Sequence, residues 1–323
     1  MIITRTPFRV SFVGGGSDLR EFYARNGFGA VASAAIDKYM YLIIHPYFHD
    51  KIRLKYAKTE DVAHVDEIEH PLIRECLRKV KIERGIEIAS FADVPAGTGL
   101  GSSSAFTVGL LNALYAYRGK VVSKERLAAE ACEIEIDILG EPIGKQDQYA
   151  AACGSLNYIA FHRDETVNVS PILMTETVKG LLENRLCLYY IGGDRRSRDI
   201  LDEQRKNTSK ARAVRSLRTL VGLAGELRDR LQSGDPDALG DILHQGWLCK
   251  KELAGGISNG RIDGLYEKAL ANGAKGGKLL GAGGAGFLLL FAPDHRKLKK
   301  ALGLRVLPFR IDREGTKIIF YES

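Results

Sequence analysis

The sequence has little that would place it in a membrane or outside the cell. Its apolar run Leu288–Phe291 is far shorter than the roughly 20 residues that a transmembrane helix needs, and its start lacks a signal-peptide pattern. Its five cysteines are odd in number and far apart, without a CxxC pair. This pattern argues against both a zinc site and a disulfide framework. The sequence therefore predicts a cytoplasmic protein with reduced thiols and no membrane partner.

A compact tract of basic residues is also missing, although basic residues outnumber acidic ones. The chain has 47 Lys and Arg against 40 Asp and Glu, a formal net charge of +7. The basic residues are dispersed among acidic ones, without stacking aromatics beside them, which argues against a nucleic-acid partner. A phosphorylated substrate together with a nucleotide explains the excess more simply. Most of these charges are expected to form a solvated surface.

The length and the element pattern predict two α+β domains. At 323 residues the chain suits two domains of about 150 residues, and 45% hydrophobic with 27% charged residues is typical of soluble globular proteins. Strands and helices mix without a regular βαβ alternation, which favours α+β. We place the boundary near residues 165–170, so that the domains are 1–168 and 169–323.

Periodicity and turn residues predict the individual elements. Strands are expected at 2–13, 30–36, 39–46, 51–56, 85–91, 157–161, 186–191 and 287–291. Helices are expected at 59–84, 105–116, 123–139, 198–253 with a break at 233–236, and 261–272. The last two strands, 306–309 and 317–321, are expected to form a hairpin around Gly315.

A glycine-rich stretch over 95–105 is the feature around which the chain is organised. Gly97, Gly99 and Gly101 alternate with other residues, so the backbone can approach a ligand closely. Serines follow at once and lead into a predicted helix, and a glycine loop before a helix N-terminus favours an anion. Ser102 or Ser103 can cap that helix, and a hydroxyl there can meet a phosphate-bound Mg²⁺. The alternative is a flexible loop with an ordinary cap.

Three acidic residues are candidates for chemistry. Asp18 follows three glycines after the first strand, and it is either a helix N-cap or a carboxylate that accepts hydrogen bonds from sugar hydroxyls. Glu135 lies at the edge of the apolar stripe of its helix, as a salt-bridge partner or a metal ligand. Asp147 lies near a helix start, where it is either a capping acid or a base.

Two further glycine-rich segments lie in the second half. The loop 192–198 carries three arginines that either grip a phosphate or are solvated. Residues 281–286 match G-x-G-x-x-G, but a strand follows where the dinucleotide motif needs a helix. Lys278 is followed by Leu279, and Asn272 stands in place of the first glycine, so a Walker A loop is also excluded. This segment is interpreted as a turn before a buried strand.

Four segments resemble the motifs of the GHMP kinases. Pro95–Ser103 matches the family's phosphate loop P-x-G-x-G-L-G-S-S throughout. The family's opening P-G-R-V-N-L-I-G-E-H-x-D aligns without gaps, with Arg9, Gly14 and Asp18 in register. Gly144–Gln148 resembles the stretch that holds the family's catalytic aspartate. Gly281–Phe287 resembles the family's third motif, which closes over the nucleotide site.

The resemblance covers essentially the whole chain and implies a two-domain kinase with ATP and Mg²⁺ at an active site between the domains. An S5-like N-terminal ATP-binding domain would span 1–168, and a C-terminal domain with a ferredoxin-like sheet would span 169–323. Ser103 and Glu135 would bind the Mg²⁺. The residues implied to bind the nucleotide are Pro95, Gly97, Gly99, Leu100, Gly101, Ser102, Ser103, Ser104, Gly283 and Gly284.

The same resemblance assigns the reacting groups. Asp147 would take or orient the proton of the acceptor hydroxyl, and Arg9 would stabilise Asp147 and the transferring phosphoryl group. Asp18 would bind sugar hydroxyls, with Gly16 and Ser17 beside it. Galactokinase has Glu-His where this chain has two glycines, which disfavours galactose. The segments 9–18 and 144–149 look like those of bacterial D-glycero-D-manno-heptose 7-phosphate kinases.

The expected reaction is therefore phosphorylation of the anomeric hydroxyl of heptose 7-phosphate to the 1,7-bisphosphate, for nucleotide-activated heptose in surface polysaccharide. The basic residues expected to bind the phosphate of the substrate are Lys145, Arg195, Arg196 and Arg198. The runner-up is a 1-kinase for L-fucose or another unphosphorylated sugar. A remote alternative is an inactive nucleotide- or sugar-binding regulator, against which Ser103, Glu135 and Asp147 together argue. The sequence leaves the oligomeric state, including a homodimer, open.

Overall fold

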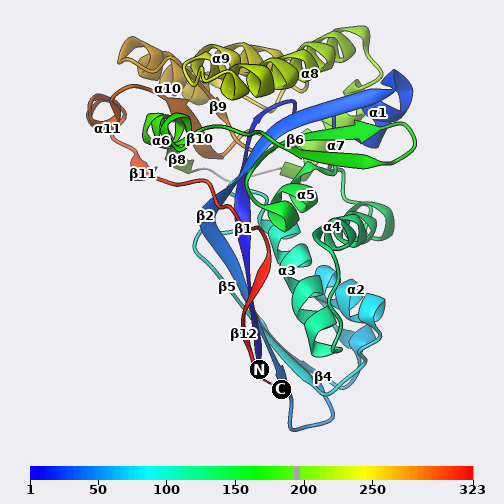
Figure 1. Cartoon of the computed structure of the whole chain (residues 1–323). Helices are drawn as coiled ribbons and strands as arrows, with labels where there is room; N and C mark the ends of the chain where they lie inside the picture. Colours follow the sequence, from blue (N-terminus) through cyan, green and yellow to red (C-terminus); the bar gives the residue numbers. More distant parts are fainter. Residues whose placement is uncertain (193–196, 323) are drawn as a thin grey trace.

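Two β-sheets form the frame of the molecule (Figure 1). The structure, a computed structural model, describes residues 1–192 and 197–322. The first sheet has eight strands in the order β12-β1-β2-β5-β3-β4, with β6 and β7 joined to it through β2. Its strands are β1 (Ile2–Val13), β2 (Phe28–Pro46), β3 (Ile52–Lys55), β4 (Thr59–Val62), β5 (Ile86–Ala92), β6 (Leu156–His162), β7 (Val167–Pro171) and β12 (Lys317–Tyr321).

The long pair β1 and β2 joins the two ends of the molecule. The strand expected at 2–13 is confirmed, and its alternating Phe8, Val10 and Phe12 are buried. The two strands expected on either side of Asp37 and Lys38 are a single strand, because the chain continues there as a bulge. The register shifts between Pro7 and Phe8, where proline has no N–H to give to the ladder.

Helices cover one face of the first sheet (Figure 1). The central helix α3 has twelve buried residues out of sixteen, because it is apolar on nearly all sides and packs between the sheet and its neighbours. The helices of this half are α1 (Arg20–Asn26), α2 (Pro71–Val80), α3 (Ser102–Tyr117), α4 (Lys124–Cys132) and α5 (Gln146–Cys153), with a 3₁₀ turn η1 (Val65–Glu67) and a π-helix η2 (Glu133–Ile138).

The second sheet is antiparallel, with the order β11-β8-β10-β9. In chain order this is 4-1-3-2 with helices in the two crossovers, so the ferredoxin-like arrangement is confirmed. Its strands are β8 (Leu186–Gly192), β9 (Gly276–Leu279), β10 (Gly286–Phe291) and β11 (Arg305–Leu307). The helices of this half are α6 (Glu176–Arg185), α7 (Ser197–Asn207), α8 (Ala211–Gln232), α9 (Ala238–Lys251), α10 (Gly260–Ala271) and α11 (His295–Leu302).

Three sequence expectations differ from the structure in whole or in part. The stretch 59–84 is a strand, a 3₁₀ turn and α2, because the Glu60 carboxylate accepts the backbone N–H groups of Glu69 and His70 and holds a loop there. The helix expected over 123–139 is confirmed in its extent, but its last part is the π-helix η2 in place of an α-helix. The last two strands form no hairpin, because β11 pairs with β8 whereas β12 pairs with β1.

The end of the chain therefore returns to its beginning. Met1 N donates to the Glu322 carbonyl at 2.7 Å, and both termini lie at the lower end of Figure 1. The domain boundary after residue 168 stays a prediction, and it falls inside β7. Among the helices of the described residues, none is both long and apolar enough to cross a membrane.

Candidate active site

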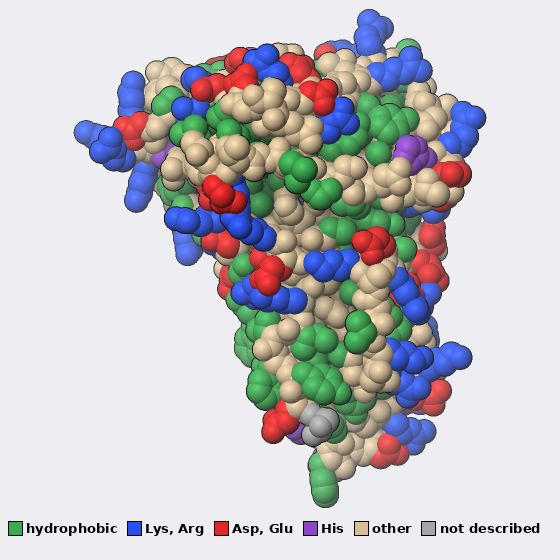
Figure 2. Space-filling model, viewed as in Figure 1, with side chains coloured by type: hydrophobic (Ala, Val, Ile, Leu, Met, Phe, Trp, Pro, Cys, Tyr) green, Lys and Arg blue, Asp and Glu red, His purple; other side chains and the backbone are tan. Residues whose placement is uncertain are grey.

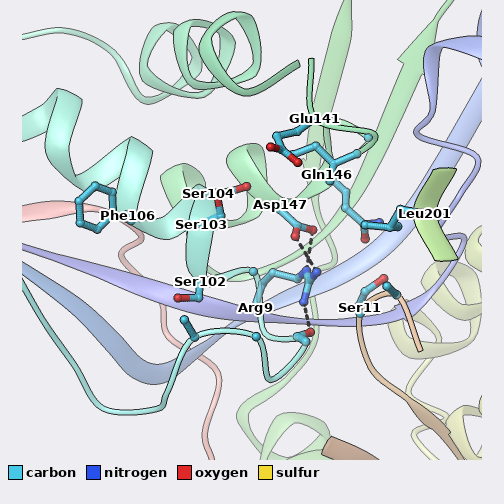
Figure 3. A pocket seen from close by; sticks show the side chains of 18 of the residues that line it. Arg9, Ser11, Ser102, Ser103, Ser104, Phe106, Glu141, Gln146, Asp147 and Leu201 are labelled. Atoms are coloured by element: carbon cyan, nitrogen blue, oxygen red, sulfur yellow. Dashed lines mark hydrogen bonds and ion pairs between the residues drawn. The ribbon is translucent and has the colours of Figure 1, made fainter. Parts of the chain in front are cut away.

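A cleft of about 870 Å³ brings the predicted motifs together. Its lining comes from β1, from the loop before α3, from the start of α5, from α7 and from β9 with the turn after it. In Figure 3, Phe106 lies at one end, the serines of α3 follow, and Arg9 with Asp147 occupies the centre. Gln146, Ser11 and Leu201 lie on the other side of that pair.

The glycine loop before α3 has the conformation that its glycines permit. The φ angles of Gly97, Gly99 and Gly101 are 76°, 89° and 75°, in the left-handed region that disfavours residues with a β-carbon. Gly101 is itself the N-cap of α3, so the expectation that Ser102 or Ser103 caps the helix is wrong. The first residues of this sixteen-residue helix line the cleft, and a helix N-terminus in such a place favours a phosphate group.

Glu135 is buried completely, not placed at an edge. It accepts hydrogen bonds from Ser103 Oγ at 2.5 Å, Ser104 Oγ at 2.8 Å and Gln148 Nε2 at 2.6 Å. The π-helical turn η2 changes the direction of its side chain from that of a regular helix. Burial raises the pKa of Glu135 to about 7, against the opposing effect of the three hydrogen bonds.

The Glu135–Ser103 pair has the donor chemistry that magnesium prefers. A carboxylate and a hydroxyl meet directly at the phosphate loop, and Mg²⁺ takes such oxygen ligands together with phosphate and water. Within the described part of the chain no group of three or more His, Cys, Asp or Glu residues is placed so that it could hold a metal ion. An ion at this place would therefore take its remaining ligands from phosphate oxygens and water.

Arg9 and Asp147 form a two-point ion pair in the centre of the cleft. Arg9 Nε donates to Asp147 Oδ1 at 2.7 Å, and Nη2 donates to Oδ2 at 2.6 Å. Arg9 Nη1 also donates to the carbonyl of Gly99 at 2.6 Å, which connects the pair to the phosphate loop. Arg9 is nearly buried, whereas the Asp147 side chain is 21% exposed. This carboxylate can therefore meet a ligand while its charge is held by the chain.

Asp18 is buried beside this pair and holds the turn after β1. Its carboxylate accepts from Gly16 N at 2.8 Å and from Gln146 N at 3.2 Å. The N-cap of α1 is Leu19, so the alternative of Asp18 as a helix cap is wrong. Burial raises the pKa of Asp18, and the charge of Asp147 adds to that effect. Gly144 must lack a side chain, because a β-carbon there would lie 2.0 Å from Asp18 Oδ2.

The third glycine segment packs directly against the phosphate loop. A β-carbon on Gly99 would lie 2.6 Å from the Leu280 carbonyl, and one on Gly286 would lie 2.4 Å from the Thr98 carbonyl. Gly281 and Ala282 line the cleft. The backbone of Gly283 and Gly284 instead approaches the connection between α9 and α10. The strand that follows, β10, confirms that this segment is not a dinucleotide motif.

Several lining residues were not identified from the sequence. Lys278 is 4% exposed and donates to the Phe12 carbonyl at 3.0 Å. Burial lowers its pKa to about 7, and the charge of Arg9 acts in the same direction. Ser11 and Gln146 also line the cleft. The only signal for Lys278 was a lysine in a short segment that leads to an apolar strand.

The residues expected to bind the substrate phosphate lie apart. Arg198 lines the cleft from α7, mostly exposed and 3.6 Å from Glu141. Lys145 lines a second cavity of about 120 Å³, where it is paired with Glu165. Gly16 lines the main cleft, whereas Ser17 Oγ donates to the Ala30 carbonyl. The expectations for Arg195 and Arg196 fall outside the described residues.

An aromatic group forms the end of the cleft beyond the serines of α3. The rings of His70 and Phe106 stack with their centroids 5.3 Å apart, and Tyr56 meets His70 edge-on at 4.8 Å. All three line the cleft. The aromatic group and the phosphate loop together suit a nucleotide.

On the outer surface, Lys and Arg lie among Asp and Glu over much of the face in Figure 2, as expected for a solvated charged surface.

Two family models match the chain. Residues 71–155 match the GHMP kinases N terminal domain, and residues 227–303 match the GHMP kinases C terminal domain. The chain belongs to the GHMP kinase family and is an ATP-dependent kinase. The first match contains the phosphate loop, Glu135 and Asp147, and the second contains Lys278 and the third glycine segment.

Named relatives are similar over most of the chain. It is 28% identical to D-glycero-alpha-D-manno-heptose 7-phosphate kinase of Campylobacter jejuni, covering 98% of each chain. It is 27% identical to bifunctional fucokinase/GDP-fucose pyrophosphorylase of Arabidopsis thaliana, covering 91% of this chain and 30% of that protein. A crystal structure of a D-glycero-D-manno-heptose 1-phosphate kinase from Bacteriodes thetaiotaomicron is 26% identical, with a TM-score of 0.82 and full coverage of both chains.

Proposed function

We propose that the protein transfers the γ-phosphoryl group of ATP to the anomeric hydroxyl of D-glycero-D-manno-heptose 7-phosphate and forms the 1,7-bisphosphate. The observation that carries this proposal is the Arg9–Asp147 pair, set between the phosphate loop and the turn that holds Asp18. Two relatives over nearly the whole chain are named as heptose phosphate kinases, which supports the sugar. We further propose a cytoplasmic enzyme whose product supplies nucleotide-activated heptose for surface polysaccharide.

The nucleotide would occupy the cleft from its aromatic end to its centre. The base would lie at Tyr56, His70 and Phe106, and the backbone of the phosphate loop would hold the phosphates. Ser103 and Glu135 would hold Mg²⁺, which when bound neutralises charge on the phosphates. Gly281 and Ala282 would close over the nucleotide from the second sheet.

Asp147 and Arg9 would act on the acceptor. Asp147 Oδ would accept the proton of the acceptor hydroxyl as the new O–P bond forms and the bond to the leaving ADP breaks. Arg9 orients that carboxylate through two hydrogen bonds and keeps positive charge at the reacting centre. Asp18, with Gly16 beside it, would bind acceptor hydroxyls. Most of the rate gain would come from such positioning and charge.

The second candidate function is a 1-kinase for L-fucose or a similar unphosphorylated sugar. It is favoured by the likeness to the fucokinase relative over 91% of this chain. The two candidates differ in whether a sugar phosphate must be bound. Arg198 at the cleft and Lys145 in the neighbouring cavity are the two described candidates for that phosphate, and we propose Arg198, because Lys145 is already paired with Glu165.

The test is ADP release with Mg·ATP and a panel of D-glycero-D-manno-heptose 7-phosphate, L-fucose, galactose and mannose. We expect turnover of the heptose phosphate alone, and a phosphorus NMR spectrum of the product with a second phosphate on the anomeric carbon. Turnover of fucose in its place would overturn the substrate while keeping the mechanism. No turnover of any sugar would overturn the proposed function.

A further inference from the structure

The centre of the cleft separates two chemically different halves. On one side lie the aromatic end and the phosphate loop, which suit a nucleotide. On the other side of Arg9 and Asp147, Figure 3 shows Ser11 and Gln146. A phosphoryl acceptor must approach the reacting centre from the side opposite the leaving nucleotide. Polar groups on this second side therefore face the acceptor.

Ser11 presents a buried hydroxyl to the cleft. It is 7% exposed, it lines the cleft, and its Oγ has no hydrogen-bond partner among the described residues. Leaving a buried polar group unpaired is costly in free energy, so such a group in a cleft favours a ligand that pairs with it. Because Ser11 lies on β1 only two residues after Arg9, it lies close to the reacting centre, where a ligand would bind. A hydroxyl of the acceptor would satisfy it.

Gln146 is in the same situation beside Gly15. Its Oε1 is buried without a partner among the described residues. A β-carbon built on Gly15 would lie 3.3 Å from Gln146 Nε2 and 3.6 Å from Ser11 Oγ. Both polar groups therefore border the space that the missing side chain leaves. The φ of Gly15 is not in the positive region, so glycine is not required there by its backbone.

Lys278 brings a donor to the same side from the other sheet. Its ammonium donates to the carbonyl of Phe12, the neighbour of Ser11, and the residue lines the cleft. Arg9, by contrast, gives its donors Nε, Nη1 and Nη2 to Asp147 and Gly99. Lys278 is thus a buried basic residue beside the reacting centre, and among the described residues its Nζ is bonded to Phe12 and not to the phosphate loop or Asp147.

We propose that Ser11, Gln146 and Lys278 form an acceptor subsite around Gly15, which we call the Gly15 subsite. Its chemistry is one carboxamide, whose Nε2 borders Gly15 and can donate and whose Oε1 can accept, one hydroxyl that does either, and one lysine Nζ that donates. This set matches neighbouring hydroxyl groups of a sugar, each of which donates once and accepts as well. The inference rests on the proposed function, because it assigns how the sugar of that reaction is recognised.

The decisive variant is Gly15→Ala, which removes no polar group and only fills the subsite. We expect the KM for the acceptor to rise at least about tenfold, while the KM for ATP stays within twofold and the melting temperature does not fall. The acceptor is the sugar of the panel that the wild-type protein turns over best. A KM for the acceptor within twofold of wild type would overturn the proposal.

Side-chain deletions then test the polar partners. Ser11→Ala is expected to raise the KM for the acceptor about fivefold, and Lys278→Met about tenfold or more, since hydrogen bonds to charged groups are stronger. The controls are Ser33→Ala, which faces Ser11 across β1 and β2 with its own bond to Val10, and Lys275→Met, which is paired with Asp237. Both controls should keep wild-type KM values.

The outcomes separate this inference from the proposed function. A rise in the KM for ATP with an unchanged KM for the sugar would assign these groups to the nucleotide and overturn the subsite. If Lys278→Met does not fold, Gly15→Ala and Ser11→Ala decide the question alone. If the wild-type protein phosphorylates no sugar of the panel, the proposed function falls first and the subsite falls with it.

Discussion

Asp147 and Glu135 are two carboxylates of one cleft with opposite surroundings. Asp147 is partly exposed and receives two hydrogen bonds from the guanidinium of Arg9. Glu135 is fully buried, and its hydrogen bonds come from two hydroxyls and one amide, all neutral. The first carries a charge that the chain itself balances. The second has a pKa of about 7 and would gain most from a cation brought by a ligand.

Under the proposed function, this difference would divide the chemistry of phosphoryl transfer between the two carboxylates. Asp147, which would meet the acceptor, is held by a cation of the protein and so would be ready before any ligand binds. Glu135, which would meet the metal ion, is held by neutral groups, and burial makes its ionisation costly until that ion binds. The basic residues show a similar contrast, because Lys145 is nearly buried and paired with Glu165 at 2.5 Å, whereas Arg198 is mostly exposed with a longer pair of 3.6 Å to Glu141.

The largest expected effect is that of Asp147→Asn. The amide keeps the shape but loses both the proton acceptor and the charge that Arg9 balances, so we expect kcat to fall about 10³-fold. ADP release measures kcat, and calorimetry with ATP should show a dissociation constant within twofold of wild type. A kcat within tenfold of wild type would show that Asp147 is not the reacting carboxylate.

Glu135→Gln comes next and tests the other carboxylate. Without the negative charge, we expect kcat/KM at limiting Mg²⁺ to fall about 10²-fold, which a magnesium titration of the initial rate measures. Glu133→Gln is the matched control, because Glu133 lies on the same π-helix but forms an exposed ion pair with Lys79. Equal effects of the two variants would remove the special role of Glu135.

The pH dependence of stability sharpens the comparison further. The folded pKa of Glu135, about 7, lies above its ordinary value of 4.5, so its stabilising contribution is present in acid and is lost as the pH rises through 7. Between pH 5 and pH 8 the metal-free wild type should lose about 2 kcal/mol of unfolding free energy relative to Glu135→Gln. Urea unfolding of both proteins in EDTA measures this. Parallel pH profiles would contradict it.

The smallest expected effect separates the two basic candidates. Arg198→Ala should raise the KM for heptose 7-phosphate about fivefold, because an exposed arginine at the cleft can reach a substrate phosphate. Lys145→Ala should change it less than twofold, since Glu165 already balances that charge. Steady-state kinetics at saturating ATP provide the values. The reverse order would place the phosphate in the smaller cavity.

Local patterns in the sequence were enough for much of the fold and for the centre of the site. The alternation in β1, the glycines before α3 and the strand after Gly286 each have a local physical cause, so these predictions are confirmed. The hairpin around Gly315 was wrong because β12 finds its partner at the other end of the chain. The prediction that Ser102 or Ser103 caps α3 was wrong: Gly101 is the cap, and Ser103 and Ser104 donate to Glu135, far along the sequence.

From the sequence alone came the family, through the resemblance of four segments to its motifs, and the α+β class, through the order of strands and helices. The glycines of the phosphate loop could be interpreted locally, because their spacing favours a particular backbone conformation before a helix. Only the tertiary structure decided which charged groups are paired within the chain and which polar groups are left to bind a ligand. Each of these features depends on residues distant in sequence: Glu135 is buried, Arg9 is paired with Asp147, and Lys278 of the second sheet bonds to Phe12. Burial and charge balance depend on such neighbours, and local spacing does not reveal them.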